Sequence, residues 1–154
     1  MFMCGILACF VPRGEPVDEK TFCRMLDSLQ HRGPDDSGIW SSPETGVMMG
    51  HRRLSVLDLS PLGHQPMESH DRRWTVVYNG EIYNWKDIRD RLVSMGVSFR
   101  STSDTEVLLE GISRWGLEAT LRQCAGMFAI AAWDREERKM YIARDRMGEK
   151  LLYY

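Results

Sequence analysis

The chain has 154 residues, of which 43% are hydrophobic and 27% charged, and its formal net charge at pH 7 is −2. This length suits one domain with a buried core, so we expect residues 1–154 to form a single domain. The small net charge gives no electrostatic reason to expect nucleic acid or an anionic membrane as a partner.

The sequence also lacks the features of membrane and exported proteins. The longest apolar run, residues 125–133, is far too short to span a bilayer. The first residues carry neither the basic region nor the cleavage site of an export signal. No CxxC spacing relates the four cysteines, Cys4, Cys9, Cys23 and Cys124. Such cysteine usage is typical of free thiols in a reducing compartment, and we expect a cytoplasmic protein.

In chain order, the first half begins with a strand and a helix. Residues 4–11 form a nearly unbroken apolar run, which predicts a strand covered on both faces. A helix should follow, with Asp18 as its N-cap and its end before Gly33-Pro34. Its apolar face has i, i+3, i+4, i+7 spacing and consists of Phe22, Met25, Leu26 and Leu29. Short strands are then predicted over residues 38–41, 47–50 and 54–57.

The second half mixes strand and helix signals without a strict βαβ rhythm. Two apolar runs, residues 74–78 and 81–83, flank Asn79-Gly80, a dipeptide that is a strong hairpin signal. Helices are predicted over residues 85–95, from Ser103 onwards, and over 117–123. Further strands are predicted over residues 97–100, 127–133, 139–143 and from 151 onwards. This mixture favours packed sheets with helices outside, an α+β layered domain.

Cys4 is the first candidate for chemistry because its thiol lies so near the amino terminus. If residues 1–3 are removed, the α-amine of Cys4 stands beside its own sulfur. An α-amine has an unperturbed pKa of roughly 7.7–8.0, so it can accept the thiol proton near neutral pH. A buried strand cysteine is the structural alternative, and position alone favours that alternative.

Two further segments each allow a structural and a functional interpretation. The Asn79 amide and the Gly80 N–H could together hold an oxyanion, and one such donor is worth about 3 kcal/mol. The spacing of this dipeptide alone favours a hairpin turn. The S-x-x-E pattern of residues 103–106 predicts a capping box, which leaves Asp104 free to point elsewhere, for instance at an ammonium group.

Basic and imidazole side chains give weaker signals. Arg52 or Arg53 could grip a carboxylate bidentately, although a solvated strand end is the simpler interpretation. No metal-ligand spacing relates the four histidines, His31, His51, His64 and His70. A zinc site built from Cys4, His31 and His51 is therefore only a third hypothesis.

Taken in order, the motifs resemble the glutaminase domain of class II glutamine amidotransferases, specifically that of the glutamine-hydrolysing asparagine synthetases. Each motif is weak by itself, but their order along essentially the whole chain is highly specific and overrides the structural interpretations. The motifs are Cys4-Gly5-Ile6, His31-Arg32-Gly33-Pro34-Asp35, Gly50-His51-Arg52-Arg53-Leu54-Ser55, Gly63-His64-Gln65-Pro66-Met67, Asn79-Gly80-Glu81-Ile82-Tyr83-Asn84, Ser103-Asp104-Thr105-Glu106, Gly126-Met127-Phe128-Ala129 and Ala143-Arg144-Asp145-Arg146.

The resemblance implies a role for each matching residue. Cys4 would be the nucleophile and its α-amine the general base, while Asn79 and the Gly80 N–H would form the oxyanion hole. Hydrolysis of glutamine would pass through a γ-glutamyl thioester and release ammonia. Arg53 would hold the α-carboxylate of glutamine, and Glu81 and Asp104 would hold its α-ammonium. Backbone groups of four residues would line the pocket, namely Leu54, Ser55, Val56 and Leu57.

The resemblance also implies a fold, cofactors and partners. The fold would be a four-layer αββα sandwich of the N-terminal-nucleophile hydrolase type, incomplete at its C-terminal end because family members continue with further strands. Glutamine would be the substrate, and a synthetase domain in cis or in trans would use the ammonia. No cofactor or metal is expected for glutamine hydrolysis, since ATP and Mg²⁺ belong to the synthetase domain. Unpaired sheet edges predict aggregation or a homo-oligomer.

One departure from the family pattern concerns the amino terminus. In the family the cysteine directly follows the initiator methionine, whereas Met1-Phe2-Met3 precede Cys4 here. If these three residues remain, the Cys4 nitrogen is an amide and cannot act as a base. The alternative function is therefore a non-catalytic remnant or binding module with a blocked Cys4.

Overall fold

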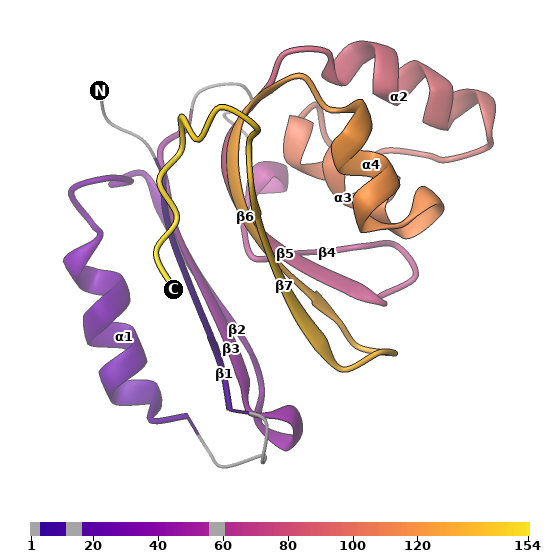
Figure 1. Ribbon diagram of the computed structural model, residues 1–154. Coiled ribbons are helices and arrows are strands. Elements are labelled where there is room, and N and C mark those ends of the chain that lie inside the picture. Colours follow the sequence, from indigo (N-terminus) through magenta and orange to yellow (C-terminus); the bar gives the residue numbers. More distant parts are fainter. Residues whose placement is uncertain (1–3, 12–16, 56–60) are drawn as a thin grey trace.

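The computed structural model describes residues 4–11, 17–55 and 61–154, and two antiparallel sheets form its centre (Figure 1). The first sheet consists of β1 (Gly5–Phe10), β2 (Asp36–Ser42) and β3 (Val47–Arg53), in the order β1-β3-β2. The second consists of β4 (Met67–Glu68), β5 (Trp74–Ile82), β6 (Gly126–Asp134) and β7 (Lys139–Arg144), in the order β4-β5-β6-β7. Two short 3₁₀ turns, η1 (Pro43–Thr45) and η2 (Pro61–Gly63), flank β3 and β4.

Helices cover the outer face of each sheet. Helix α1 (Glu19–Ser28) packs on β1 and β3, and it lies alone beside the first sheet in Figure 1. The second sheet is covered by α2 (Trp85–Ser94), α3 (Asp104–Trp115) and α4 (Leu117–Gln123). Strands β1 and β3 contact β5 across the space between the sheets. The predicted α+β fold with four αββα layers is therefore confirmed.

The alternating direction of side chains along the strands produces two separate apolar cores. Successive side chains of a strand point to opposite faces, so Val77 of β5 faces the other sheet while Val76 faces the helices. The inner core lies between the sheets and contains Val47, Met49, Val77, Ala131 and Trp133. The outer core joins β5 and β6 to the helices and includes Ile82, Ile88, Leu92, Leu109 and Ile112.

The predicted helices are confirmed, with one difference at α1. Asp18 caps α1, because its carboxylate accepts a hydrogen bond of 3.2 Å from the Lys20 N–H. Phe22 and Leu26 are buried beneath the helix, whereas Met25 is 51% exposed. The apolar face of α1 is thus narrower than the periodicity predicts.

The hairpin predicted at Asn79-Gly80 is wrong. Both residues lie inside β5, which pairs with β6 over its whole length, with Asn79 opposite Ala129 and Gly80 opposite Phe128. The strand partner comes from more than forty residues further along the chain, and this long-range pairing overrides the local turn preference of Asn-Gly.

Three other predicted strands are also absent from the described residues. Residues 97–100 form an irregular connection before α3, and residues 151–154 have no strand partner. Leu54 and Ser55 continue irregularly after β3, while Val56 and Leu57 lie outside the described residues. Leaving the sheet after Arg53 frees the backbone of Leu54 and Ser55 for other contacts.

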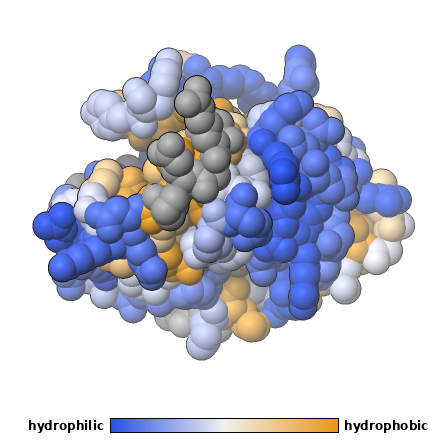
Figure 2. Space-filling view, turned by 90° about the horizontal axis from the view of Figure 1, so that it is seen from below, coloured by the Kyte–Doolittle hydropathy of each residue, from blue (hydrophilic) through white to orange (hydrophobic). Residues whose placement is uncertain are grey.

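Among the described residues, every helix is too short or too polar to span a lipid bilayer. Seen from below, at the end where β1 finishes, the molecule exposes mainly hydrophilic residues with smaller apolar areas (Figure 2).

Candidate active site

Strand register brings Cys4 and Arg53 together at one end of the first sheet. Gly5 is opposite Arg52 in the β1–β3 ladder, so Cys4, one residue earlier, is level with Arg53. Alternate residues of β1 from Ile6 onwards pack against the inner core, and Cys4 has the same parity. The thiol and the guanidinium therefore both belong to the inward face.

The Cys4 thiol is held by the backbone of Leu54. The Leu54 N–H donates to Cys4 Sγ over 3.3 Å, and the thiol lies 3.6 Å from the Leu54 carbonyl oxygen. Burial raises the pKa of this thiol, and the nearby Asp104 carboxylate raises it further, while the hydrogen bond from Leu54 and the Arg53 charge oppose the rise. The net pKa is above the ordinary value, so Cys4 needs a base to become a thiolate.

Arg53 is a buried cation at the end of β3, with only 8% of its surface exposed. Its guanidinium lies against Gly63, where an added Cβ would come within 2.1 Å of Arg53 Nη2. A glycine at this position therefore makes room for the guanidinium. Asp35 fixes the following turn, because its N–H bonds to the Arg53 carbonyl at 3.0 Å and its carboxylate accepts from the Ser55 N–H at 2.8 Å.

Asn79 and Gly80 lie near the end of β5 in the second sheet. Asn79 has the same parity in β5 as the inward-facing Val77 and is 6% exposed. At Gly80 the neighbouring strand approaches so closely that a Cβ would lie 2.3 Å from the Met127 carbonyl oxygen. Only glycine fits there, so this residue allows β5 and β6 to stay paired at close approach.

Asp104 begins α3 and points away from its own helix. Its Oδ2 accepts hydrogen bonds from the Tyr78 hydroxyl at 2.8 Å and from the Ile82 N–H at 3.0 Å, and the residue is 4% exposed. Burial raises the pKa of the carboxyl; these two hydrogen bonds oppose the rise, and the Glu81 charge adds to it. Asp104 therefore has a second carboxylate, that of Glu81, in its neighbourhood.

The predicted capping box is confirmed in one half only. The Ser103 hydroxyl accepts from the Glu106 N–H at 3.1 Å, as such a box requires. The Glu106 carboxylate, however, reaches upstream of the N-cap to the N–H groups of Arg100 at 2.9 Å and Ser101 at 2.7 Å. Glu106 therefore anchors the connection before α3, while the Asp104 carboxylate points elsewhere, as the capping box predicts.

The structure does not bring Cys4, His31 and His51 together as the zinc hypothesis requires. His31 is exposed near the end of α1, with Nδ1 2.9 Å from the Ser28 carbonyl, whereas His51 is 1% exposed in the interior. Burial lowers the pKa of His51 to about 4, so the imidazole is neutral and donates from Nε2 to the Tyr78 carbonyl at 3.1 Å. Within the described ranges, no three His, Cys, Asp or Glu side chains are placed to hold a metal ion.

Sequence reasoning missed Tyr78 and Gln65, which link Asp104 and its neighbour Thr105 to β5. Gln65 Oε1 accepts from the Tyr78 N–H at 2.7 Å, and its amide donates to the Thr105 hydroxyl at 3.4 Å. Gln65 belongs to a recognised motif, but no local signal relates its amide to Tyr78. The one sequence signal for these two residues is that each is a polar residue close to apolar residues.

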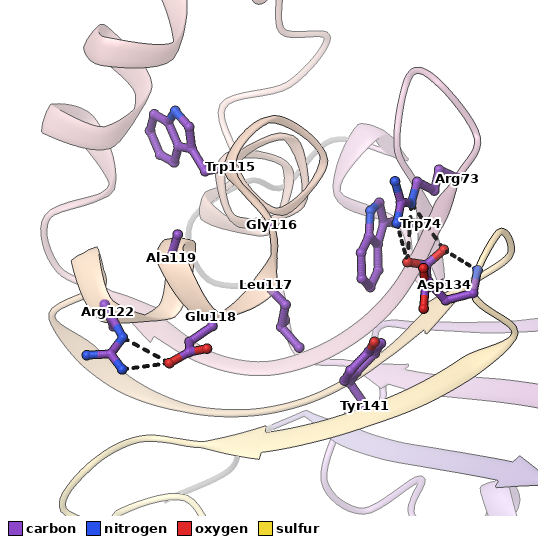
Figure 3. A pocket seen from close by; sticks show the side chains of 11 residues that line it. Arg73, Trp74, Trp115, Gly116, Leu117, Glu118, Ala119, Arg122, Asp134 and Tyr141 are labelled. Carbon is purple, nitrogen blue, oxygen red and sulfur yellow. Dashed lines mark hydrogen bonds and ion pairs between the residues drawn. The ribbon is translucent and has the colours of Figure 1, made fainter.

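A large pocket elsewhere does not belong to this site. Figure 3 shows it between the α3–α4 corner and the second sheet, with Trp74, Trp115 and Tyr141 in its wall. Its volume is about 720 Å³. Trp74 and Glu81 are seven residues apart in β5, which is about 23 Å along a strand. Neither Cys4 nor any charged residue of the candidate site lines this pocket.

Comparison with solved structures defines the class of fold. Glutamine phosphoribosylpyrophosphate amidotransferase from Bacillus subtilis superposes with a TM-score of 0.69 over 93% of this chain and 37% of that chain, at 21% sequence identity. The fold is therefore that of an amidotransferase of the N-terminal-nucleophile hydrolase type, as the resemblance implied.

Sequence comparison then identifies the family. Residues 3–154 match the model of the glutamine amidotransferase domain, and the chain belongs to that family. It is 43% identical over 155 residues to asparagine synthetase [glutamine-hydrolyzing] 3 of Bacillus subtilis. It is 39% identical over 165 residues to a putative asparagine synthetase [glutamine-hydrolyzing] of Mycobacterium tuberculosis. These matches cover 99% and 98% of this chain but only 25% of each relative.

Proposed function

We propose that this domain hydrolyses free glutamine to glutamate and ammonia, with Cys4 as the nucleophile. The observation that carries the proposal is that three unlike groups interact electrostatically, one just before β1, one at the end of β3 and one at the start of α3. They are the half-buried thiol of Cys4, the buried guanidinium of Arg53 and the buried carboxylate of Asp104. A cation and an anion beside a nucleophile suit a zwitterionic substrate.

The chemistry begins with the removal of the thiol proton. When Cys4 is the first residue, its α-amine accepts this proton and Sγ attacks the amide carbon of glutamine. The Asn79 amide and the Gly80 N–H stabilise the negative oxygen of the tetrahedral intermediate. The α-ammonium then returns the proton to the leaving nitrogen, ammonia departs, and a γ-glutamyl thioester remains.

Water completes the cycle. The Cys4 α-amine accepts a proton from water, whose oxygen attacks the thioester carbon, and the second tetrahedral intermediate is held by the same donors. Its collapse breaks the C–S bond, the proton returns to sulfur, and glutamate leaves. The Leu54 N–H, 3.3 Å from Sγ, stabilises negative charge on sulfur at both stages.

Substrate recognition uses the charged residues around Cys4. Arg53 binds the α-carboxylate bidentately, while Glu81 and Asp104 bind the α-ammonium. Leu54 and Ser55 border the pocket, and we propose Val56 and Leu57 as further lining residues. A free amino acid carries both charges, so the site selects glutamine over a glutaminyl residue within a peptide.

The ammonia would serve a synthetase activity, in cis or in trans, as in a glutamine-hydrolysing asparagine synthetase. Support comes from the relatives, whose names carry that activity and of which this chain spans about a quarter. ATP and Mg²⁺ are proposed for the synthetase reaction and not for glutamine hydrolysis. The blocked binding module is the competing proposal, since an amide nitrogen at Cys4 would permit glutamine binding without turnover.

The nucleophile is tested by measuring ammonia and glutamate released from glutamine by a chain that begins at Cys4. Equal amounts of both products are expected, and Cys4→Ala should abolish their release. Cys9→Ala is the matched control, because Cys9 is a free, half-buried thiol in β1 with a parity opposite to that of Cys4. Turnover that survives Cys4→Ala would refute the proposal.

A further inference from the structure

Tyr78 is a buried residue that the reaction described above does not use. It is 3% exposed, and its side chain belongs to the outer core between β5 and the helices. Its hydroxyl nevertheless reaches the candidate site, donating to Asp104 Oδ2 at 2.8 Å. Burial and the Asp104 charge raise the pKa of Tyr78 well above its ordinary value, so the phenol keeps its proton and remains a donor.

The main chain of Tyr78 is fixed from two sides. Its carbonyl accepts from His51 Nε2 at 3.1 Å, and its N–H donates to Gln65 Oε1 at 2.7 Å. Gln65 also donates to Thr105, the neighbour of Asp104. Tyr78, Gln65, Thr105 and Asp104 therefore form a closed ring of contacts, which leaves the phenol little freedom to turn away from Asp104.

The groups around Asp104 determine how much the hydrogen bond from Tyr78 matters for its ionisation. The titratable groups that interact with its charge include Glu81, three residues after Tyr78 on β5, Cys4 before β1 and Cys124 after α4. None of these three supplies positive charge. Hydrogen bonds from the Tyr78 hydroxyl and from the backbone of Ile82 and Thr105 favour an ionised Asp104, and among these three donors Tyr78 supplies the side chain.

We propose that Tyr78 is a positioning residue that makes the site select substrates with an α-ammonium group, through its hydrogen bond to Asp104. The inference rests on the proposed function, in which Asp104 binds that ammonium. A purely structural role for the phenol predicts a different outcome, because loss of packing would weaken every substrate alike. Substrate discrimination therefore separates the two roles.

The experiment compares glutamine with glutaramate, which is glutamine without its α-amine. For Tyr78→Phe we expect KM for glutamine to rise about tenfold, the size typical of one lost hydrogen bond to a charged group, with kcat nearly unchanged. The kcat/KM for glutaramate should change by less than about twofold, since that ligand never uses Asp104. An equal loss for both substrates would overturn the proposal, and so would no loss for either.

Tyr141→Phe is the matched control, because it removes a hydroxyl from the same sheet. The Tyr141 ring lies 5.8 Å from that of Trp74 in the pocket of Figure 3, far from Cys4. Its kinetics should equal those of the unmodified chain with both substrates. Thermal melting of both variants shows whether each one is folded.

A binding measurement keeps the inference separate from the chemistry. Calorimetric titration of a Cys4→Ala chain, with and without Tyr78→Phe, gives affinities for glutamine and glutaramate without turnover. A selective loss of glutamine affinity supports the role of Tyr78 even if Cys4 proves not to be the nucleophile. An unchanged ratio of the two affinities refutes that role even if turnover is normal.

Discussion

At the scale of single residues, the ionised carboxylate of Asp104 is proposed to bind the substrate, but its burial reduces the stability of the fold. Burial raises the pKa of its carboxyl above the ordinary value of 3.8. A carboxyl with a raised pKa stabilises the fold at pH values below its unfolded pKa, and this contribution is lost as pH rises through the folded pKa. At neutral pH the ionised Asp104 therefore lowers the free energy of unfolding.

Asp104→Asn should stabilise the protein while weakening glutamine binding. The asparagine oxygen can still accept from Tyr78 and Ile82, and no buried charge remains, so we expect a gain of up to about 1 kcal/mol at pH 7. Denaturant unfolding at pH 7 checks the gain, and the glutamine KM checks the loss. Destabilisation by this variant would contradict a strained, functional carboxylate.

At the scale of elements, the connection that leads into α3 depends on the buried carboxylate of Glu106. The pKa of Glu106 is lowered, whereas that of Asp104 is raised. Burial favours the neutral form of Glu106, but the Ser101 hydroxyl and the N–H groups of Arg100 and Ser101 outweigh it and lower the pKa below 4.5. The stabilisation is therefore present at neutral pH and is lost as pH falls through the folded pKa.

Glu106→Gln should destabilise the protein by about 2 kcal/mol at pH 7, because an amide cannot accept all these hydrogen bonds. The difference from the unmodified chain should shrink below pH 4. Unfolding curves at several pH values measure both effects. Glu118→Gln is the control, since Glu118 is 80% exposed in its pair with Arg122 and should change stability by less than about 0.5 kcal/mol.

Helices were predictable from sequence because their signals are local. Asp18 and Ser103 act as caps within a few residues of the apolar faces that they precede. Asn79-Gly80 was not predictable as a strand, because β5 is fixed by its pairing with β6 rather than by its own turn preference. Local chemistry thus predicts element type well, except where distant backbone supplies the partner.

The candidate site also has features that the sequence predicts and features that it does not. Motif order singled out Cys4, Arg53, Asn79 and Asp104. The fold brings Cys4 and Arg53 to the same end of the first sheet, and Asp104 is close enough to raise the pKa of the thiol. The hydrogen bond from Leu54 to the thiol spans 50 positions, and that from Tyr78 to Asp104 spans 26. No periodicity encodes such pairs, because they exist only once the two sheets and α3 are packed.

At the scale of the whole molecule, the sheets end in strands with an unpaired side. In the part that the structure describes, β1 and β7 each have one strand neighbour. Ile142 of β7 is 45% exposed, so that edge carries an apolar side chain. Such an edge favours pairing between copies, and the predicted homo-oligomer remains to be tested.

Sedimentation velocity over a range of concentrations tests that association. We expect a self-associating chain, and Ile142→Lys should shift it towards monomer because a charged side chain disfavours edge pairing. Met147→Lys adds the same charge at an exposed residue outside any strand and should have no effect. A single monomeric species for the unmodified chain would show that the edge does not pair.

The proton acceptor for Cys4 is the claim on which the enzymatic account depends. The direct measurement is the initial rate of ammonia release from glutamine by a chain beginning at Cys4, beside one that retains Met1-Phe2-Met3, each verified by intact mass. The account predicts similar glutamine affinity for both chains but a rate about 10²–10⁴-fold lower when the Cys4 nitrogen is an amide. Equal rates would contradict it.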